Sequence, residues 1–181
     1  GFPNTDFISS SKTRKRIDAR KVKEVGQNET LNTEVLIDIS PDVIMSFGIN
    51  NSNPTLDNLQ KSGLKVVLNG DWNELSPLGK AEWIKLFGAL YGLDAKAKTI
   101  FSNIEKEYKN TLALVQKTSR KPTVLSGAMY QDQWFVPQGQ SWAAVFLAQA
   151  KASYLWADTK GSGSLSLPFE IVLDKAQNAE F

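Results

Sequence analysis

The 181-residue chain contains no cysteine and no histidine. Without cysteine it forms no disulfide and offers no thiolate as a nucleophile or metal ligand. Without histidine it lacks the most common general base, the Ser-His-Asp triad and the usual zinc ligand sets. Aspartate, glutamate, lysine and tyrosine remain, so an enzyme is disfavoured but not excluded, and a binding protein becomes the better expectation.

Long apolar runs are also missing. No run approaches the roughly 20 residues that a membrane-spanning helix needs, and no segment resembles a signal peptide. Hydrophobic residues make up 41% of the chain and charged residues 22%, a composition typical of a folded globular domain. The sequence opens without Met at Gly1 and stops at Phe181. We therefore expect it to be truncated at both ends.

Charge is unevenly distributed. Residues 12–23 hold seven basic residues and one acidic residue, a net +6, which leaves −4 for the rest of a chain whose total is +2. Such a run can bind nucleic acid or an anionic surface. A solvated surface loop is the more common explanation and the preferred one, because no aromatic side chain interrupts the run to stack on bases.

Strand and helix patterns alternate along the chain, which favours an α/β fold. Apolar strand patterns at 43–47 and 64–68 flank a helix capped by Asn53, which predicts a parallel pair. A helix from Pro77 to Gly92 and a long one over 94–117 follow. The second half predicts strands at 123–126 and 134–136, a helix from Ser141 to about residue 152, and a last helix opened by Ser166 and Pro168. Residues 161–164 (GSGS) read as a flexible linker or, preferably, as a loop within one domain.

Five segments in a fixed order carry a family resemblance. They are 25–44, 59–67, 81–97, 134–142 and 166–176. Together they resemble the substrate-binding proteins of ABC importers for iron–siderophore complexes, haem and vitamin B12. The resemblance implies two Rossmann-like lobes joined by a long rigid helix. It assigns 1–75 to the remainder of the N-terminal lobe, 76–118 to a helix pair with the interlobe helix, and 119–181 to the first part of the C-terminal lobe.

The resemblance also implies partners and a location. A permease in the inner membrane would receive the ligand, and the protein would be periplasmic or a membrane-anchored lipoprotein whose signal precedes Gly1. Glu34 and Glu170, one on a short helix of each lobe, match the acidic residues that pair with permease arginines in this family. A charge-assisted contact at each place would fix orientation. The alternative is a solvated glutamate near a helix N-terminus.

Candidate ligand contacts are residues at strand ends and in the loops that follow, where open α/β sheets usually bind ligands. They are Asn50, Asn51, Asp71, Trp72, Tyr130, Trp134, Gln138, Ser141 and Trp142. Aromatic rings would give flat apolar contact and amides would orient the ligand's polar rim. Each tryptophan is equally well explained as a core or lobe-interface side chain.

The missing histidines bear on the ligand. Family members that bind bare zinc or manganese use histidine-rich ligand sets, so no metal site is expected here. Haem would need an axial ligand, for which Tyr130 is the candidate. A ferric siderophore carries its own iron ligands and fits best, with no cofactor and no catalytic residue required. Two rivals remain: a doubly wound α/β enzyme, for which no phosphate loop or acid/base pair is found, and a nucleic-acid or protein interaction module that uses residues 12–23.

Overall fold

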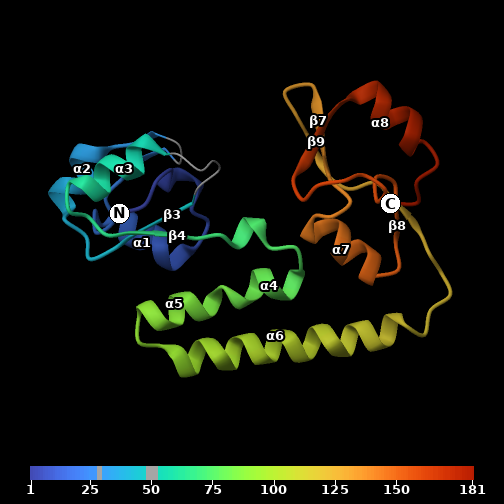
Figure 1. Ribbon diagram of the computed structural model, residues 1–181, viewed down its shortest axis with the longest axis horizontal. Coiled ribbons are helices and arrows are strands. Elements are labelled where there is room, and N and C mark those ends of the chain that lie inside the picture. Colours follow the sequence, from blue (N-terminus) through green and yellow to red (C-terminus); the bar gives the residue numbers. More distant parts are fainter. Residues whose placement is uncertain (28–29, 48–52) are drawn as a thin grey trace. The chain divides into compact units, whose positions relative to one another are not determined.

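The structure is a computed structural model that describes residues 1–27, 30–47 and 53–181. The chain divides into two compact units, Gly1–Gly70 and Asp71–Phe181, which are treated separately below. Both combine helices with strands, and the predicted α/β class is confirmed (Figure 1). The three-part division at residues 75 and 118 stays a prediction.

The first unit is built around a parallel strand pair. Its elements are η1 (Thr5–Phe7), α1 (Ser11–Asp18), β1 (Gly26–Gln27), β2 (Thr30–Leu31), α2 (Thr33–Ile39), β3 (Ile44–Ser46), α3 (Pro54–Lys61) and β4 (Val66–Leu68). Strands β3 and β4 pair in parallel, with Ile44 opposite Val66, as predicted. The Asn53 side chain accepts a hydrogen bond from the Leu56 N–H and so begins α3, also as predicted.

Apolar side chains of α2 and α3 cover the core of this unit. Leu36 of α2 and Leu56 and Leu59 of α3 are buried together with Val25 and Ile44. The i, i+3 spacing of the two α3 leucines places them on one face of the helix, which explains why they are buried together. Gly63 follows α3 with a φ of +83°, a conformation that glycine adopts without strain.

The N-terminal segment differs from the prediction, because the basic run at 12–23 is not a loop throughout. Its first half forms α1, which Ser10 caps through the Thr13 N–H. The Arg14 guanidinium donates to the carbonyls of Thr5, Asp6 and Ile8 at 2.6, 3.2 and 3.0 Å. These bonds give the helix a tertiary contact that a reading of charge alone does not reveal.

Glu24, which directly follows the basic run, binds the first residues of the chain. Its carboxylate accepts hydrogen bonds from the Thr5 hydroxyl and from the backbone N–H groups of Asn4 and Thr5. The Thr5 hydroxyl is the main reason that the pKa of Glu24 lies below its ordinary value. The first residues of the chain are thereby held against Glu24, and Phe2 pairs with it in a backbone bridge.

The second unit begins with helices. They are η2 (Asp71–Asn73), α4 (Pro77–Glu82), α5 (Ile84–Leu90) and α6 (Asp94–Val115). The helix predicted from Pro77 to Gly92 is in fact two, which meet at Trp83. The Trp83 indole donates to Glu74 at 2.8 Å, and this bond draws the junction toward the preceding loop. Helix α6 occupies the predicted place; its 22 residues span about 33 Å.

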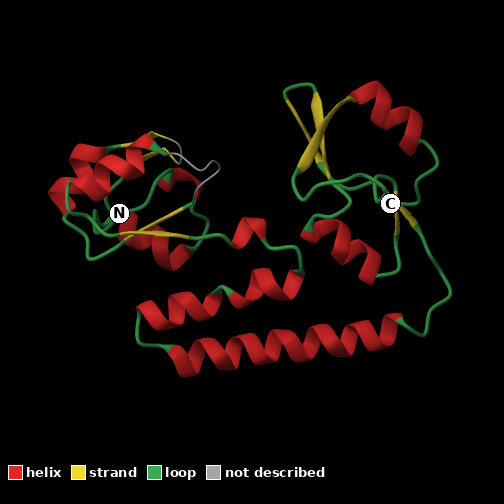
Figure 2. Ribbon diagram, in the orientation of Figure 1, coloured by secondary structure: helices red, strands yellow, loops and turns green. Residues whose placement is uncertain are grey.

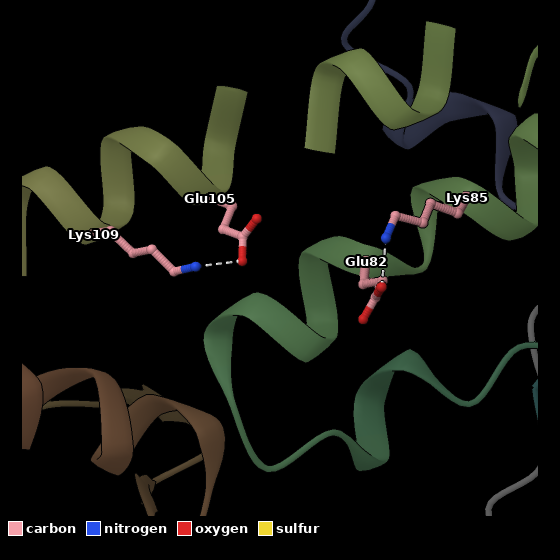
Figure 3. A network of polar contacts seen from close by, with 4 residues as sticks. All are labelled: Glu82, Lys85, Glu105 and Lys109. Atoms are coloured by element: carbon pink, nitrogen blue, oxygen red, sulfur yellow. Dashed lines mark hydrogen bonds and ion pairs between the residues drawn. The ribbon is translucent and has the colours of Figure 1, made fainter. Parts of the chain in front are cut away.

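Ion pairs support the junction and the long helix. Lys85 binds Glu82 at 2.5 Å across the α4–α5 junction, and Lys109 binds Glu105 at 2.7 Å along α6. Figure 3 shows both ion pairs. The Lys85 ammonium also lies 4.1 Å from the centre of the buried Phe101 ring on α6. Lys85 therefore joins α4, α5 and α6.

The strands of this unit form two small sheets. Its remaining elements are β5 (Thr123–Val124), β6 (Ala128–Tyr130), β7 (Gln133–Pro137), α7 (Trp142–Gln149), β8 (Ser153–Tyr154), β9 (Ser164–Pro168) and α8 (Phe169–Ala176). β5 and β8 pair in parallel, and β6, β7 and β9 form an antiparallel sheet with β7 in the middle. Strands β6, β8 and β9 were not predicted.

The prediction that Ser166 and Pro168 open the last helix is wrong. Both belong to β9, and α8 begins only at Phe169. Figure 2 shows this strand leading into the last helix. The physical reason is the alternation of serine with leucine, because Leu165 and Leu167 face the core while Ser164 and Ser166 are exposed. Pro168 then ends the strand in an extended conformation.

The core of the second unit lies between the antiparallel sheet, α7 and α8. Val136 and Val172 are almost wholly buried there, with Ala144, Tyr154 and Trp156. The Tyr154 hydroxyl donates to the Pro137 carbonyl at 2.6 Å, and burial raises the pKa of this phenol to about 12.

Among the described residues, no helix combines the length and the apolar character that a membrane-spanning segment requires.

Replacing Tyr154 with phenylalanine removes the bond to Pro137 and should lower the free energy of unfolding by about 1 kcal/mol near neutral pH. The folded-state pKa exceeds the ordinary value of 10, so the neutral phenol's contribution is complete below pH 10 and lost as pH rises toward 12. Urea unfolding at several pH values should show that the difference in free energy of unfolding between wild type and Tyr154→Phe shrinks as pH rises from 10 to 12. The exposed Tyr91→Phe is the matched control, and an equal loss in both variants would contradict the assignment.

Candidate functional site

The antiparallel sheet of the second unit divides the predicted ligand residues between two faces. Met129 lies opposite Trp134, and Tyr130 lies opposite Gln133. Because neighbouring residues of a strand point to opposite faces, Tyr130 and Trp134 lie on different sides of the sheet. The structure therefore does not bring these two aromatic side chains together.

Trp134 faces inward. It is half-buried in the core beside Leu167, and its ring lies 6.5 Å from that of Phe169. Its indole N–H is buried and finds no hydrogen-bond partner among the described residues. Next to it, Gly127 has a φ of +118°, and a Cβ there would lie 2.1 Å from the Phe135 carbonyl oxygen. This environment favours a core role for Trp134.

The outward face of the sheet carries a different set of side chains. Tyr130 is 64% exposed and Phe135 is 39% exposed. Gln133 lies on the same face, and the Ser166 hydroxyl donates to its amide oxygen at 3.1 Å. Two aromatic rings beside two polar side chains make this a surface that a flat ligand with a polar rim can contact. The sequence pattern singled out only Tyr130; the strand pairing adds Phe135, Gln133 and Ser166.

Ser141 and Gln138 have structural partners. Ser141 is 3% exposed and its hydroxyl accepts from the Ala144 N–H, which begins α7 as predicted. The Gln138 amide oxygen accepts from the Gly163 N–H at 3.0 Å, and its backbone N–H donates to the Gly163 carbonyl. Residues 161–164 are therefore held against Gln138, as the preferred loop interpretation requires. The side-chain oxygen of each residue is therefore already hydrogen-bonded within the protein.

A lysine that the sequence analysis did not single out connects two other candidates. The Lys80 ammonium on α4 lies 5.2 Å from the centre of the Trp142 ring and 3.5 Å from the Asp71 carbonyl oxygen. Trp142 is the first residue of α7, and Trp72 follows Asp71 in η2 with 41% of its surface exposed. The structure thus brings Asp71 and Trp142 to one half-buried cation. No sequence motif indicated this contact, which depends on the packing of α4 against α7.

Asn50 and Asn51 lie outside the described residues. Within the described ranges, no group of three or more acidic side chains is placed to hold a metal ion.

The two predicted docking glutamates occupy equivalent local positions. Glu34 lies in the first turn of α2 and Glu170 in the first turn of α8. Both side chains are exposed, and neither forms an ion pair with any residue that the structure describes. An acidic side chain in the first turn is favoured by the helix dipole, and it remains available for an external cation.

Glu34 also lines a shallow depression of about 560 Å³ on the first unit. Its walls come from α1, α2 and the segment after α1. They consist of Ile17, Arg20, Val22, Lys23, Glu24, Glu34, Val35 and Asp38. Lys23 is paired with Asp38 at 2.7 Å, and Glu24 accepts hydrogen bonds from Asn4 and Thr5. Arg20 and Glu34 are therefore the oppositely charged members with neither an ion pair nor a side-chain hydrogen bond among the described residues.

Comparison with known proteins identifies the family. Residues 4–180 match the sequence profile of the periplasmic binding protein family. The chain therefore belongs to this family, whose members are binding proteins that serve transport and not enzymes. The expectation that the chain is not an enzyme agrees with this.

One curated relative is an uncharacterized lipoprotein of Methanocaldococcus jannaschii, 28% identical over an alignment of 163 residues that covers 88% of this chain and 39% of the relative. The chain spans less than half the length of each curated relative it matches.

Solved structures show the same fold. The periplasmic haem binding protein HutB of Vibrio cholerae superimposes with a TM-score of 0.66 and 14% identity, over 87% of this chain and 60% of that one. The siderophore binding protein FhuD of Vibrio cholerae, bound to Fe3+-Desferal, gives a TM-score of 0.63 and 20% identity, over 86% and 60%.

The structural role of Gln138 predicts a loss of stability on its removal. Gln138→Ala should lower the free energy of unfolding by about 1 kcal/mol, because the Gly163 N–H loses its acceptor. Urea unfolding without ligand measures this, with the exposed Gln60→Ala on α3 as control. Unchanged stability together with lost ligand binding would instead make Gln138 a ligand contact.

Proposed function

We propose that this chain is part of the substrate-binding component of an ABC importer. In this proposal the protein captures a ferric-siderophore-type iron complex between two lobes and delivers it to a membrane permease. The observation that carries the proposal is the family match over residues 4–180, nearly the whole chain.

The described side chains support an iron chelate over a bare metal ion. The chain has no histidine or cysteine and, within the described ranges, no group of three acidic side chains placed to hold a metal ion, which favours a metal that arrives with its own ligands, as in a ferric siderophore. The exposed rings of Tyr130 and Phe135 suit the apolar parts of such a chelate. The Lys80 ammonium beside Trp142 suits its oxygen-rich, anionic parts.

Haem and cobalamin are the alternatives within the family. The Tyr130 hydroxyl is exposed at the end of β6 and is the axial ligand that haem would use. Cobalamin needs no ligand from the protein and would rely on the aromatic surfaces alone.

The proposed permease contacts are Glu34 and Glu170. Each carboxylate is exposed, without an ion pair among the described residues, and held by a short helix whose first turn favours negative charge. Arginine side chains of the permease would bind such carboxylates with two parallel hydrogen bonds, which fixes orientation as well as position. The family and the lipoprotein relative support a location outside the cytoplasm, with a membrane anchor.

The ligand is tested by titrating the tryptophan fluorescence of the full-length protein with ferric hydroxamates, ferric catecholates, haem and cobalamin. We expect saturable quenching by one ferric chelate class that persists when the ionic strength is raised about tenfold. Lys80→Gln should weaken that binding by about tenfold, because a charge-assisted contact is lost, while the exposed Lys98→Gln on α6 should not. Quenching by haem or cobalamin alone would replace the iron-chelate assignment, and no response to any of them would overturn the proposed function.

Permease docking is tested by charge reversal. Glu34→Lys and Glu170→Lys should each lower ligand uptake by the reconstituted transporter about tenfold, with ligand affinity unchanged. Asp57→Lys and Asp94→Lys are matched controls, because both residues are exposed acids in the first turn of a helix. Equal effects in all four variants would show that overall charge, and not these positions, governs docking.

A further inference from the structure

The basic run at 12–23 has no role in the function proposed above, and its cations fall into two groups. Arg14 donates to three backbone carbonyls of the segment before α1, and Lys23 is paired with Asp38. The other five are exposed and form no ion pair with any residue in the described ranges. These are Lys12, Lys15, Arg16, Arg20 and Lys21.

Three of these cations share one face of α1. Lys12, Lys15 and Arg16 are spaced i, i+3 and i+4, which places them side by side on the helix surface. Thr13, Arg14 and Ile17 are half-buried on the side that faces the unit. Ile17, the one apolar residue of these three, is therefore turned toward the unit, and the cationic side of α1 is directed to solvent. Such a helix can attach to a charged surface without inserting into it.

The position of α1 indicates which charged surface the helix would contact. Ile17 and Arg20 line the same depression as Glu34. A body that binds Glu34 therefore also approaches α1 and the residues that follow it. If Glu34 docks on the outer surface of a permease, the neighbouring cations lie near the bilayer that surrounds the permease.

We infer that the five free cations of α1 and residues 20–21 form a contact for anionic lipid headgroups beside the docked permease. This inference rests on the proposed function, because the docking of Glu34 places α1 at the membrane. Positive charge complements the negative surface of a bilayer, and each lysine or arginine near the surface strengthens attachment about fivefold. A nucleic acid is disfavoured, because no aromatic side chain lies within 12–23 to stack on bases and because the proposed location is outside the cytoplasm.

The test uses the full-length protein and sedimentation with vesicles. One set is phosphatidylcholine with about 30 mol% phosphatidylglycerol, and the other is phosphatidylcholine alone. The neutral vesicles measure any binding through a membrane anchor, which does not depend on anionic headgroups. The test variant is Lys12→Gln/Lys15→Gln/Arg16→Gln, which leaves Arg14 and Lys23 in place. The matched control is Lys96→Gln/Lys98→Gln/Lys106→Gln, which removes the same charge from exposed positions on α6.

We expect the wild type and the α6 variant to bind the anionic vesicles better than the neutral ones, and the α1 variant to lose roughly a hundredfold of that preference. Raising the ionic strength about tenfold should remove the preference as well. Equal binding by the two variants, or no preference for anionic vesicles, would overturn the inference. So would tighter binding to double-stranded DNA than to the anionic vesicles under the same conditions.

The fluorescence titration separates this inference from the proposed function. The α1 variant should bind the ferric chelate as the wild type does, because none of its three changed residues is among the candidate ligand contacts. Normal chelate binding without vesicle binding would refute only the membrane contact. Vesicle binding without any chelate response would refute the proposed function and leave a membrane-binding protein of another kind.

Discussion

The alternation of side chains across the antiparallel sheet of the second unit determines what each surface around it can do. Strand β7 sends Trp134 and Val136 into the core and Gln133 and Phe135 to solvent. The inward pair holds α7 and α8 in place, and the outward pair leaves an aromatic, polar surface open. A shift of one residue in the pairing would exchange the two faces, so the buried Val136 fixes the register on which the proposed ligand surface depends.

Helix α7 connects this sheet to the long helix of the same unit. The Tyr108 hydroxyl on α6 donates to the Gln149 side chain, and its ring stacks on Phe146 at 6.1 Å. Beyond the end of α7, the Lys151 ammonium donates to the carbonyls of Gln116 and Thr118, where α6 ends. These contacts satisfy carbonyls that the helix end leaves free. Gln149 and Lys151 therefore have a structural role in this chain, because they join α7 and the residues after it to α6.

Much of the fold was predictable where the signal is local. Asn53 and Ser141 cap the helices that they were expected to begin, and the parallel pair of the first unit follows from two apolar runs around a helix. Strand β9 was missed because Ser166 and Pro168 are also good helix-start residues, and only the pairing with β7 decides between the two. The candidate site was less predictable for the same reason. Which face Tyr130 takes depends on strand register, and the approach of Lys80 to Trp142 depends on packing between helices that are distant in sequence.

The loop at residues 161–164 reads as a linker, yet its composition has another cause. Gly161 has a φ of +106°, and a Cβ there would lie 2.6 Å from the Gln138 amide oxygen. The positive φ requires glycine whatever fills the neighbouring space, and the Gln138 side chain, which accepts a hydrogen bond from Gly163, lies where a Cβ would be. Glycine at 161 is therefore a demand of the backbone at this turn. Among related proteins it should persist wherever the loop keeps this conformation, even where 138 is no longer glutamine, so its presence carries information about a fixed backbone and not about loop flexibility.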